Sequence, residues 1–401
     1  MLQTMNSIMQ ARSGFAGLLT ACLLQQACTT NAKSSALTEV DASAQDAAPK
    51  AVDYSGGHYA LTADWLQQTL SIVDLRKVKH GANYADVVVE TMDLSEHDLG
   101  PMELVVTPDS KTAIVSVSAG FFAVPGSGII VNGTVPTGPG ELLFVDLEHL
   151  KVTKSLQSGM GPMGILLTHE GTQAVVAHFS SSELALIDVS AQDVLDHINV
   201  GPYSEELALD DTGEVAIFSY SAAGNIRTFS ADDPSQTLSD DVSLTGDAAG
   251  VAFFPGTKIA YVVQAPNPLT SPMGGHDLID VSDPQAPVVL ESVRDANAPV
   301  SYPAVAHAAR GSVIVPAVIS NKLQLLEYTL KGDKAELVGT TPVTDVTLFG
   351  AFHTTIDPKG RVLCAVPREH LLTSTNLETG ESIVIPWNDT APGPTDVQVI
   401  P

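Results

Sequence analysis

Residues 393–401, GPTDVQVIP, form the end of the chain and decide how the rest of it folds. The same pattern, Gly-Pro followed by an apolar run, occurs at residues 100–108 (GPMELVVTP) and at residues 161–168 (GPMGILLT). A repeat that stops after its first strand leaves that strand without a sheet of its own. We therefore predict that the final strand completes the first repeat and closes a ring, because closure removes two exposed sheet edges.

Seven copies of this inner-strand pattern are spaced by roughly 40 to 60 residues, which is room for four short antiparallel strands and their turns. The copies lie at residues 104–107, 165–168, 206–209, 251–254, 304–307, 354–357 and 397–400. The first repeat has strand-like runs at residues 59–63, 69–74 and 87–92 but no inner strand before them. The sequence predicts an all-β fold, a seven-bladed β-propeller whose first blade is completed by the C-terminal strand.

Composition supports a globular β protein and excludes one class of partner. The chain has 401 residues, 44% of them hydrophobic and only 5% aromatic, with 31 glycines and 25 prolines to punctuate short strands. Acidic residues outnumber basic ones 46 to 19, which gives a net charge of -27. This charge repels phosphate backbones, so we expect no nucleic-acid partner.

The N-terminal segment predicts export. Arg12 precedes the apolar residues 15–19, and residues 19–22 (LTAC) resemble a bacterial lipobox. The resemblance implies that residues 1–22 are a lipoprotein signal and that Cys22 becomes the lipidated N-terminus; Cys28 and a plain secretory signal are the alternatives. We expect residues 23–52 to be a flexible tether and residues 53–401 the propeller. The expected location is the periplasm or cell surface, as a monomer that meets the membrane only through its anchor.

The repeats resemble a known family. Residues 100–101 (GP), 106–109 (VTPD) and 186–189 (LIDV) are similar to the YVTN-type β-propeller repeat, and the likeness extends from residue 57 to the end of the chain. The resemblance implies the propeller fold. The Gly-His and Trp-Asp dipeptides of WD40 blades are missing from this pattern.

One position of the repeat is rich in ionisable residues. Aligning the inner strands on Pro108 and its equivalents places the following residues in one ring: Glu103, Gly164, Glu205, Gly250, Pro303, His353 and Asp396. Three carboxylates and an imidazole could bind a divalent metal ion through oxygen and nitrogen ligands. The alternative is a water-filled channel lined with polar groups. His276, which follows a second insertion, is a further candidate on the presumed same face.

Two insertions, residues 119–140 and 265–275, are predicted to share one face with the mouth of the channel, and long loops often carry binding function. We expect a small-molecule or protein ligand on that face. The alternative is an enzyme. Some propellers similar to this one are lactonases, which implies a hydrolase with Glu103, Glu205, His353 and Asp396 at the channel mouth and His353 or Glu103 as base. Nucleophile elbow, HExxH, CxxC and Walker motifs are absent.

Overall fold

A computed structural model places most of the propeller. It describes residues 52–97, 100–118, 139–201, 204–220, 224–244, 246–265, 273–295, 300–301, 303–346, 350–387 and 393–401. The predicted signal at residues 1–22, Cys22, Cys28 and the tether up to residue 51 lie outside the described residues. So do residues 119–138 and 266–272, the greater part of the two predicted insertions.

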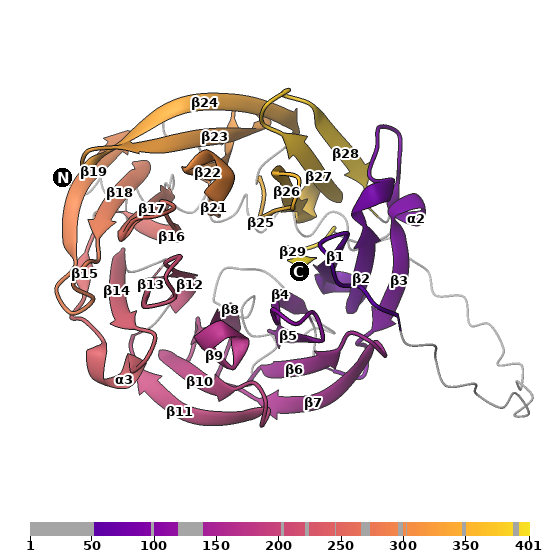
Figure 1. Cartoon of the computed structure of the whole chain (residues 1–401), viewed down its shortest axis with the longest axis horizontal. Helices are drawn as coiled ribbons and strands as arrows, with labels where there is room; N and C mark the ends of the chain where they lie inside the picture. Colours follow the sequence, from indigo (N-terminus) through magenta and orange to yellow (C-terminus); the bar gives the residue numbers. More distant parts are fainter. Residues whose placement is uncertain are drawn as a thin grey trace, which may run out of the picture.

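Seven antiparallel sheets surround a central channel, as the sequence predicts (Figure 1). The first three blades each have four strands. Blade 1 contains β29 (Asp396–Ile400), β1 (Tyr59–Asp64), β2 (Thr69–Asp74) and β3 (Val88–Asp93). Blade 2 contains β4 (Pro101–Val106), β5 (Thr112–Val117), β6 (Glu141–Asp146) and β7 (Lys151–Gln157). Blade 3 contains β8 (Pro162–Thr168), β9 (Gln173–His178), β10 (Glu183–Asp188) and β11 (Asp193–Asn199).

The remaining blades repeat this order from the channel outward. Blade 4 contains β12 (Ser204–Leu209), β13 (Val215–Tyr220), β14 (Asn225–Ser230) and β15 (Val242–Ser243). Blade 5 contains β16 (Asp247–Phe253), β17 (Ile259–Ala265), β18 (Gly274–Asp280) and β19 (Val288–Asp295). Blade 6 contains β20 (Val300–Ser301), β21 (Val305–His307), β22 (Ser312–Ile319), β23 (Lys322–Lys331) and β24 (Lys334–Asp345). Blade 7 contains β25 (His353–Ile356), β26 (Arg361–Val366), β27 (Leu371–Asn376) and β28 (Ser382–Pro386).

Helical structure in the described residues is confined to short connections. The α-helical turns are α2 (Tyr84–Val87) and α3 (Pro234–Thr237), and the 3-10 turns are η1 (Trp65–Gln67), η2 (Leu75–Lys77), η4 (His169–Gly171), η5 (Ala308–Arg310) and η6 (Pro367–Glu369). None of the helices in this part of the chain has the length and apolar character needed to cross a membrane.

The C-terminal strand closes the ring, which confirms the central prediction from the sequence. β29 pairs antiparallel with β1, and Val397 lies opposite Thr62 in the register. The Val397 side chain is fully buried. The first and last strands of the propeller therefore share one sheet, and blade 1 has no free inner edge.

The core lies between neighbouring blades. Each pair of adjacent blades encloses its own cluster of buried aliphatic and aromatic side chains, drawn from the facing sides of the two sheets. Both faces of the middle strands are buried in this arrangement, so these strands are apolar runs, whereas an outer strand such as β7 alternates between exposed and half-buried residues. The seven clusters fix the relative orientation of the blades around the channel.

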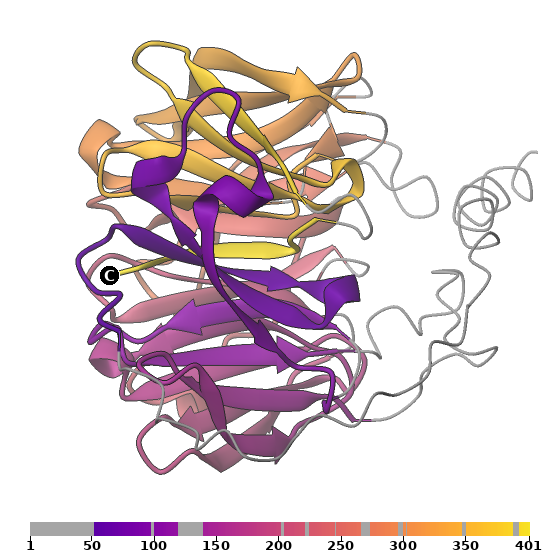
Figure 2. The same ribbon diagram turned by 90° about the vertical axis from the view of Figure 1, so that its right-hand side faces the viewer.

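The two faces of the propeller are told apart by the end of the chain, and the side view shows the C terminus at one of them (Figure 2). Every inner strand runs in the same direction, and β29 ends at the face that carries the C terminus, which we call the C-terminal face. The chain also enters the propeller there, because the amide of Gly56 donates a hydrogen bond to the carbonyl of Pro401 at 2.8 Å. The opposite face, which we call the loop-bearing face, is where β5 ends and β6 begins and where the inner strands begin.

A buried carboxylate joins the first blade to the last. Asp64, at the end of β1, accepts hydrogen bonds from Trp387 Nε1 at 3.0 Å and from Ser71 Oγ at 2.6 Å. Thr62 and Thr69 donate to it as well. Burial raises the pKa of Asp64 to about 6, and the four hydrogen bonds only partly oppose this. Because Trp387 follows β28, this contact adds a side-chain link to the backbone closure made by β29.

This carboxylate predicts a pH dependence of stability. The folded state keeps the Asp64 proton to about pH 6, whereas the unfolded chain loses it near pH 4. The folded state therefore binds more protons between these values, and the free energy of unfolding should fall by on the order of 3 kcal/mol from pH 4 to pH 6 through this group. The Asp64→Asn variant lacks this titrating group. Its free energy of unfolding should therefore rise relative to that of the wild type as the pH rises from 4 to 6.

Urea unfolding at several pH values measures this difference. Asp193→Asn, at an exposed position, is the control and should follow the wild type. If the difference in unfolding free energy between the wild type and Asp64→Asn stayed constant from pH 4 to pH 7, Asp64 would not titrate as inferred.

Candidate functional site

The candidate site lies where the inner strands begin. Glu103 is the third residue of β4, Glu206 the third of β12 and His353 the first of β25. In both β4 and β12 the pairing with the second strand shifts register just before this point, between Pro101 and Leu104 in β4 and between Ser204 and Leu207 in β12. Such bulges often redirect side chains beside functional sites. Here the two bulges coincide with Glu103 and Glu206, whose carboxylates reach the channel.

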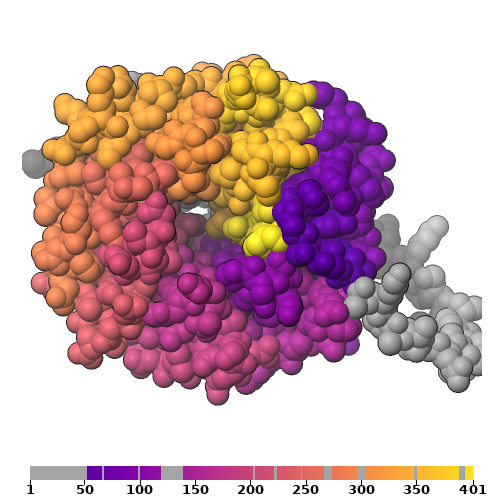
Figure 3. All heavy atoms as spheres, in the orientation of Figure 1, coloured from indigo at the N-terminus to yellow at the C-terminus, as the bar shows by residue number. Residues whose placement is uncertain are grey.

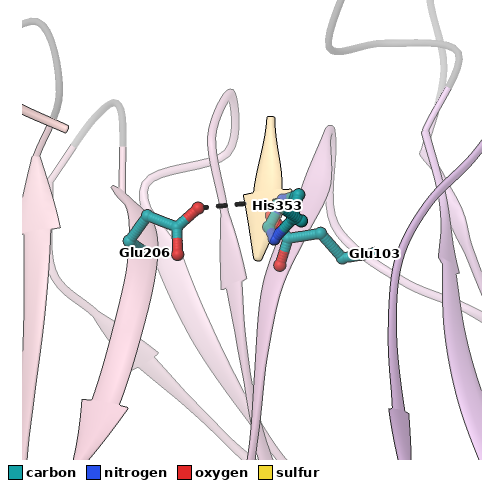
Figure 4. Close-up of side chains that lie close together, drawn as sticks. All are labelled: Glu103, Glu206 and His353. Atoms are coloured by element: carbon teal, nitrogen blue, oxygen red, sulfur yellow. Dashed lines mark ion pairs between the residues drawn. The ribbon is translucent and has the colours of Figure 1, made fainter. Parts of the chain in front are cut away.

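Three ionisable side chains converge there (Figure 4). His353 Nε2 lies 3.1 Å from Glu103 Oε1 and 3.9 Å from Glu206 Oε1. Each of the three residues offers one ligand atom, and these atoms all lie within 4.8 Å of one another. The cavity beside them has a volume of about 120 Å³ and is lined by residues of all seven blades.

Asp396 holds the cluster together from the closing strand. Its carboxylate accepts hydrogen bonds from the amides of Leu104 at 2.8 Å and Val397 at 2.6 Å. Gln398 Nε2 donates to it at 3.3 Å, and His353 Nδ1 lies 3.8 Å away. Asp396 therefore ties β29 to β4 and faces the imidazole on the side opposite Glu103. Ring closure and site assembly depend on the same residue.

The electrostatics of the cluster favour a charged imidazole. Burial by itself would lower the pKa of His353. The nearby carboxylates outweigh burial, Glu103 first and then Asp396 and Glu206, so this pKa is raised well above its ordinary value. An imidazolium is a proton donor, so these surroundings favour the proton-donating form of His353 over the form that would act as a base.

The neighbouring carboxylates also have altered proton affinity. Burial raises the pKa of Glu206 well above its ordinary value, and the charge of Glu103 adds to this effect. Burial raises the pKa of Asp396 to about 6; the positive charge of His353 opposes that shift, and the negative charge of Glu103 adds to it. The site thus holds more negative groups than one imidazolium can neutralise.

The structure brings together Glu103, His353 and Asp396 but replaces two members of the predicted ring, Glu205 and, in blade 5, Gly250, whose neighbour Val251 lines the cavity instead. Glu206, not Glu205, lines the cavity. Glu205 is buried next to it in the bulge of β12. The predicted alignment is displaced by one residue in blade 4, because Asp211 stands where blade 2 has Pro108 and so provides no anchor. Successive side chains of a strand lie on opposite sides, so an alignment that is wrong by one residue selects the glutamate on the wrong side.

A turn signal in the sequence identifies the correct residue. Gly213 and Gly360 both have positive φ, at 75° and 74°, in equivalent turns after the inner strands. Counting back seven residues from Gly360 gives His353, and counting back seven from Gly213 gives Glu206. Aligning the left-handed turn positions would therefore have found the ligand that the proline alignment missed.

His276 does not belong to this site. It lies on β18, the third strand of blade 5, and is not among the residues that line the cavity. Its ring stacks on Tyr261 with centroids 4.8 Å apart, and its Nε2 lies 3.5 Å from Glu291. Burial lowers the pKa of His276. The residue is part of the packing between blades 5 and 6.

Two other ring positions carry small residues and leave space for the cavity. Gly164 and Pro303 line it, in blades 3 and 6. A side chain at Gly164 would meet the backbone of the neighbouring blade, since an added Cβ would lie 2.1 Å from the carbonyl oxygen of Glu205. Glycine at this position lets β8 and β12 approach each other and brings Glu103 and Glu206 to opposite sides of one small cavity.

Comparison with known proteins supports the fold. No protein-family model matches the sequence, and no curated protein matches it either. Among solved structures, a functionally unknown protein from Desulfotomaculum acetoxidans has a TM-score of 0.63 at 12% identity and covers 85% of this chain and 98% of its own. The periplasmic gluconolactonase of Pseudomonas aeruginosa has a TM-score of 0.60 at 13% identity and covers 86% of this chain and 99% of its own.

A putative 6-phosphogluconolactonase from Bacteroides fragilis is similar to the same extent, with a TM-score of 0.59, 11% identity, and 85% of this chain and 97% of its own covered. At these identities the likeness shows the fold alone. Propellers named as lactonases are thus among the structural neighbours, as the resemblance predicts, while membership of the YVTN-type repeat family stays a prediction from the sequence.

Proposed function

We propose that this propeller binds a divalent cation in its channel through Glu103, Glu206 and His353, and that the bound cation is the centre of a small-ligand site. The observation that carries the proposal is the convergence of two carboxylates and an imidazole within 4.8 Å. Glu103 Oε1 and His353 Nε2 are both buried, and neither has a well-aligned hydrogen bond although they lie 3.1 Å apart. A cation bound between these two atoms would supply the partner that a buried polar atom needs.

The spacing of the ligand atoms supports the same proposal. Ligand atoms that lie about 2.1 Å from a metal ion, at angles of roughly 90–110°, are roughly 3.0–3.4 Å apart. The separation of 3.1 Å between Glu103 and His353 falls in this range, and the separation of 3.9 Å between His353 and Glu206 needs only a small rotation of a glutamate side chain. Two oxygens and one imidazole nitrogen favour Mn²⁺ or Zn²⁺ over Mg²⁺, which prefers oxygen ligands alone.

The charge of the cavity also favours a cation. Among the described residues that line it there is no lysine or arginine, whereas three carboxylates surround the one histidine. An anion such as a phosphate would find no fixed positive side chain to oppose its charge apart from His353. The net charge of -27 acts in the same direction over the whole molecule.

Isothermal titration of the chelator-treated full chain with Mn²⁺ tests the proposal. The expected result is one binding site per chain, with Zn²⁺ competing for it and Mg²⁺ binding more weakly. Absence of binding for all three ions would overturn the proposal.

A second candidate is hydrolysis of a lactone. The carboxylate and imidazole groups beside an open channel favour it, and the structural neighbours named as lactonases make it worth testing. A bound cation would supply polarisation of the ring-ester carbonyl. His353 would hold this cation through Nε2, and Asp396, 3.8 Å from Nδ1, would fix the orientation of the imidazole. Because the described residues of the lining include no lysine or arginine, the substrate would be an uncharged lactone, not a phosphorylated one.

A screen of the Mn²⁺-treated protein against a neutral sugar lactone and its phosphorylated counterpart separates the two candidates. A hydrolase should open the neutral ring faster and lose that activity in His353→Ala. A cation-binding scaffold should open neither ring above the rate in buffer.

We also propose that the protein is exported and anchored through Cys22. The support is the lipobox-like residues 19–22, and the name of one structural neighbour as a periplasmic enzyme agrees with export. Metabolic labelling with a radioactive fatty acid, in a bacterial host, tests the anchor. Label that persists in Cys22→Ser and disappears in Cys28→Ser would reassign the processed residue to Cys28.

A further inference from the structure

The inner strands differ in exposure along their length. In β4 the first four residues are buried and the last two half-buried, and in β12 the first two are buried and the remaining four are half-buried. In β25 only His353, the first residue, is buried. All these strands run from the loop-bearing face to the C-terminal face. Along these three strands the channel wall is therefore buried at the loop-bearing end and more accessible to water beyond the ionisable cluster, whereas β16 is half-buried only at its first residue.

An apolar cluster lies at the loop-bearing end, on the side of the ring formed by blades 7, 1, 2 and 3. Met102 and Met163 are fully buried, and Trp65 and Phe179 pack against them, with Phe352 at the edge. Met102 and Phe352 each precede a member of the ionisable cluster by one residue, and Met163 precedes Gly164 of the same ring. The apolar cluster thus lies one residue closer to the loop-bearing face than the carboxylates do. Hydrated ions cross such a layer poorly, because leaving water for an apolar environment costs them free energy.

The C-terminal face is open at its centre. The space-filling view of this face shows a hollow at its centre, between the ends of the inner strands (Figure 3). Gln398 stands between this opening and the cluster, because it lines the cavity, is half-buried and donates to Asp396. The strand ends that flank the two predicted insertions lie at the other face.

We infer that the occupant of the channel site enters and leaves through the C-terminal face, past Gln398, and not through the loop-bearing face. The identity of that occupant rests on the proposed function; the route rests only on the burial of the channel walls. Gln398 is a positioning residue in this arrangement, because it acts on the site through Asp396.

The size of the cavity limits what can occupy it. At about 120 Å³ it is well below the roughly 300–1,000 Å³ of pockets that hold whole drug-sized ligands. It suits a cation with a few waters, or one functional group of a larger ligand. A larger ligand would have to insert one end and extend along the channel toward the C-terminal face.

Thiol labelling tests the route without depending on any ligand. Gln398→Cys places a thiol on the C-terminal side of the cluster, and Met163→Cys places one on the loop-bearing side. With metal-free full-length protein and N-ethylmaleimide, we expect Gln398→Cys to react at least roughly tenfold faster, because thiol reactivity follows exposure. Mass spectrometry reads each introduced site, so Cys22 and Cys28 do not interfere, and Cys364 is buried.

Thr355→Cys and Met102→Cys form a second pair, in case one of the first variants fails to fold. Loop-side thiols that react as fast as those on the C-terminal side would overturn the inference. Addition of Mn²⁺ should slow labelling at Gln398→Cys. If the difference between the two sides persists but Mn²⁺ gives no protection, the route stands and the proposed cation site is contradicted.

Discussion

Replacing Glu206 by glutamine is expected to lower the affinity for Mn²⁺ by at least about 100-fold, since changes to mere outer-shell partners of a metal already cost 10–100-fold. Glutamine keeps the shape of the side chain and removes only its negative charge and one strong ligand oxygen. Glu103→Gln should have an effect of the same size, because its Oε1 lies 3.1 Å from His353 Nε2. Isothermal titration of the chelator-treated variants measures the change.

Glu205 offers a matched control one residue away. Glu205→Gln makes the same chemical change at a buried carboxylate that is not among the residues lining the cavity. Its affinity for Mn²⁺ should stay within about threefold of the wild type, a difference below about 1 kcal/mol. If Glu205→Gln lost binding and Glu206→Gln kept it, the register derived for β12 would be wrong, and with it the proposed set of ligands.

Removal of residues 396–401 is expected to prevent formation of a stable propeller. The deletion takes away β29, whose Val397 and Ile400 are fully buried in the clusters on either side of blade 1. Burial of each such side chain contributes about 1.5–3 kcal/mol, and the ladder to β1 is lost as well. The total is comparable to the roughly 5–15 kcal/mol that stabilises a whole domain.

Circular dichroism during heating and size-exclusion chromatography measure the effect. The truncated chain should show no cooperative unfolding transition at the wild-type temperature and should aggregate through the exposed edge of β1. Pro401→Ala, at an exposed position that keeps its backbone carbonyl, should melt like the wild type. A truncated protein that melted cooperatively at the wild-type midpoint would mean that the ring is stable without closure.

Much of the architecture could be predicted because its signals are local. Turn residues separate each apolar run from the next, and the absence of an inner strand before Tyr59 pointed to residues 397–400 as its partner. The site was harder to predict. Glu103, His353 and Asp396 came from aligned repeats, but Glu206 was missed because the alignment relied on a proline that blade 4 lacks. His276 was included from its neighbourhood in sequence, although its ring packs between two blades.

The sequence by itself therefore determined the number of blades, the closing strand and the ring position at which ionisable residues gather, because strand periodicity and turn chemistry act between near neighbours in the chain. The tertiary structure decided how a glutamate of blade 4 reaches the channel, because the bulge in the pairing of β12 with β13 accompanies Glu206 at the cavity, a residue that the glycine of the following turn marks in the sequence. It also decided that the loop-bearing end of the channel is apolar along blades 7, 1, 2 and 3. Met102, Met163 and Trp65 come from three different blades and form an apolar layer only after the ring has assembled.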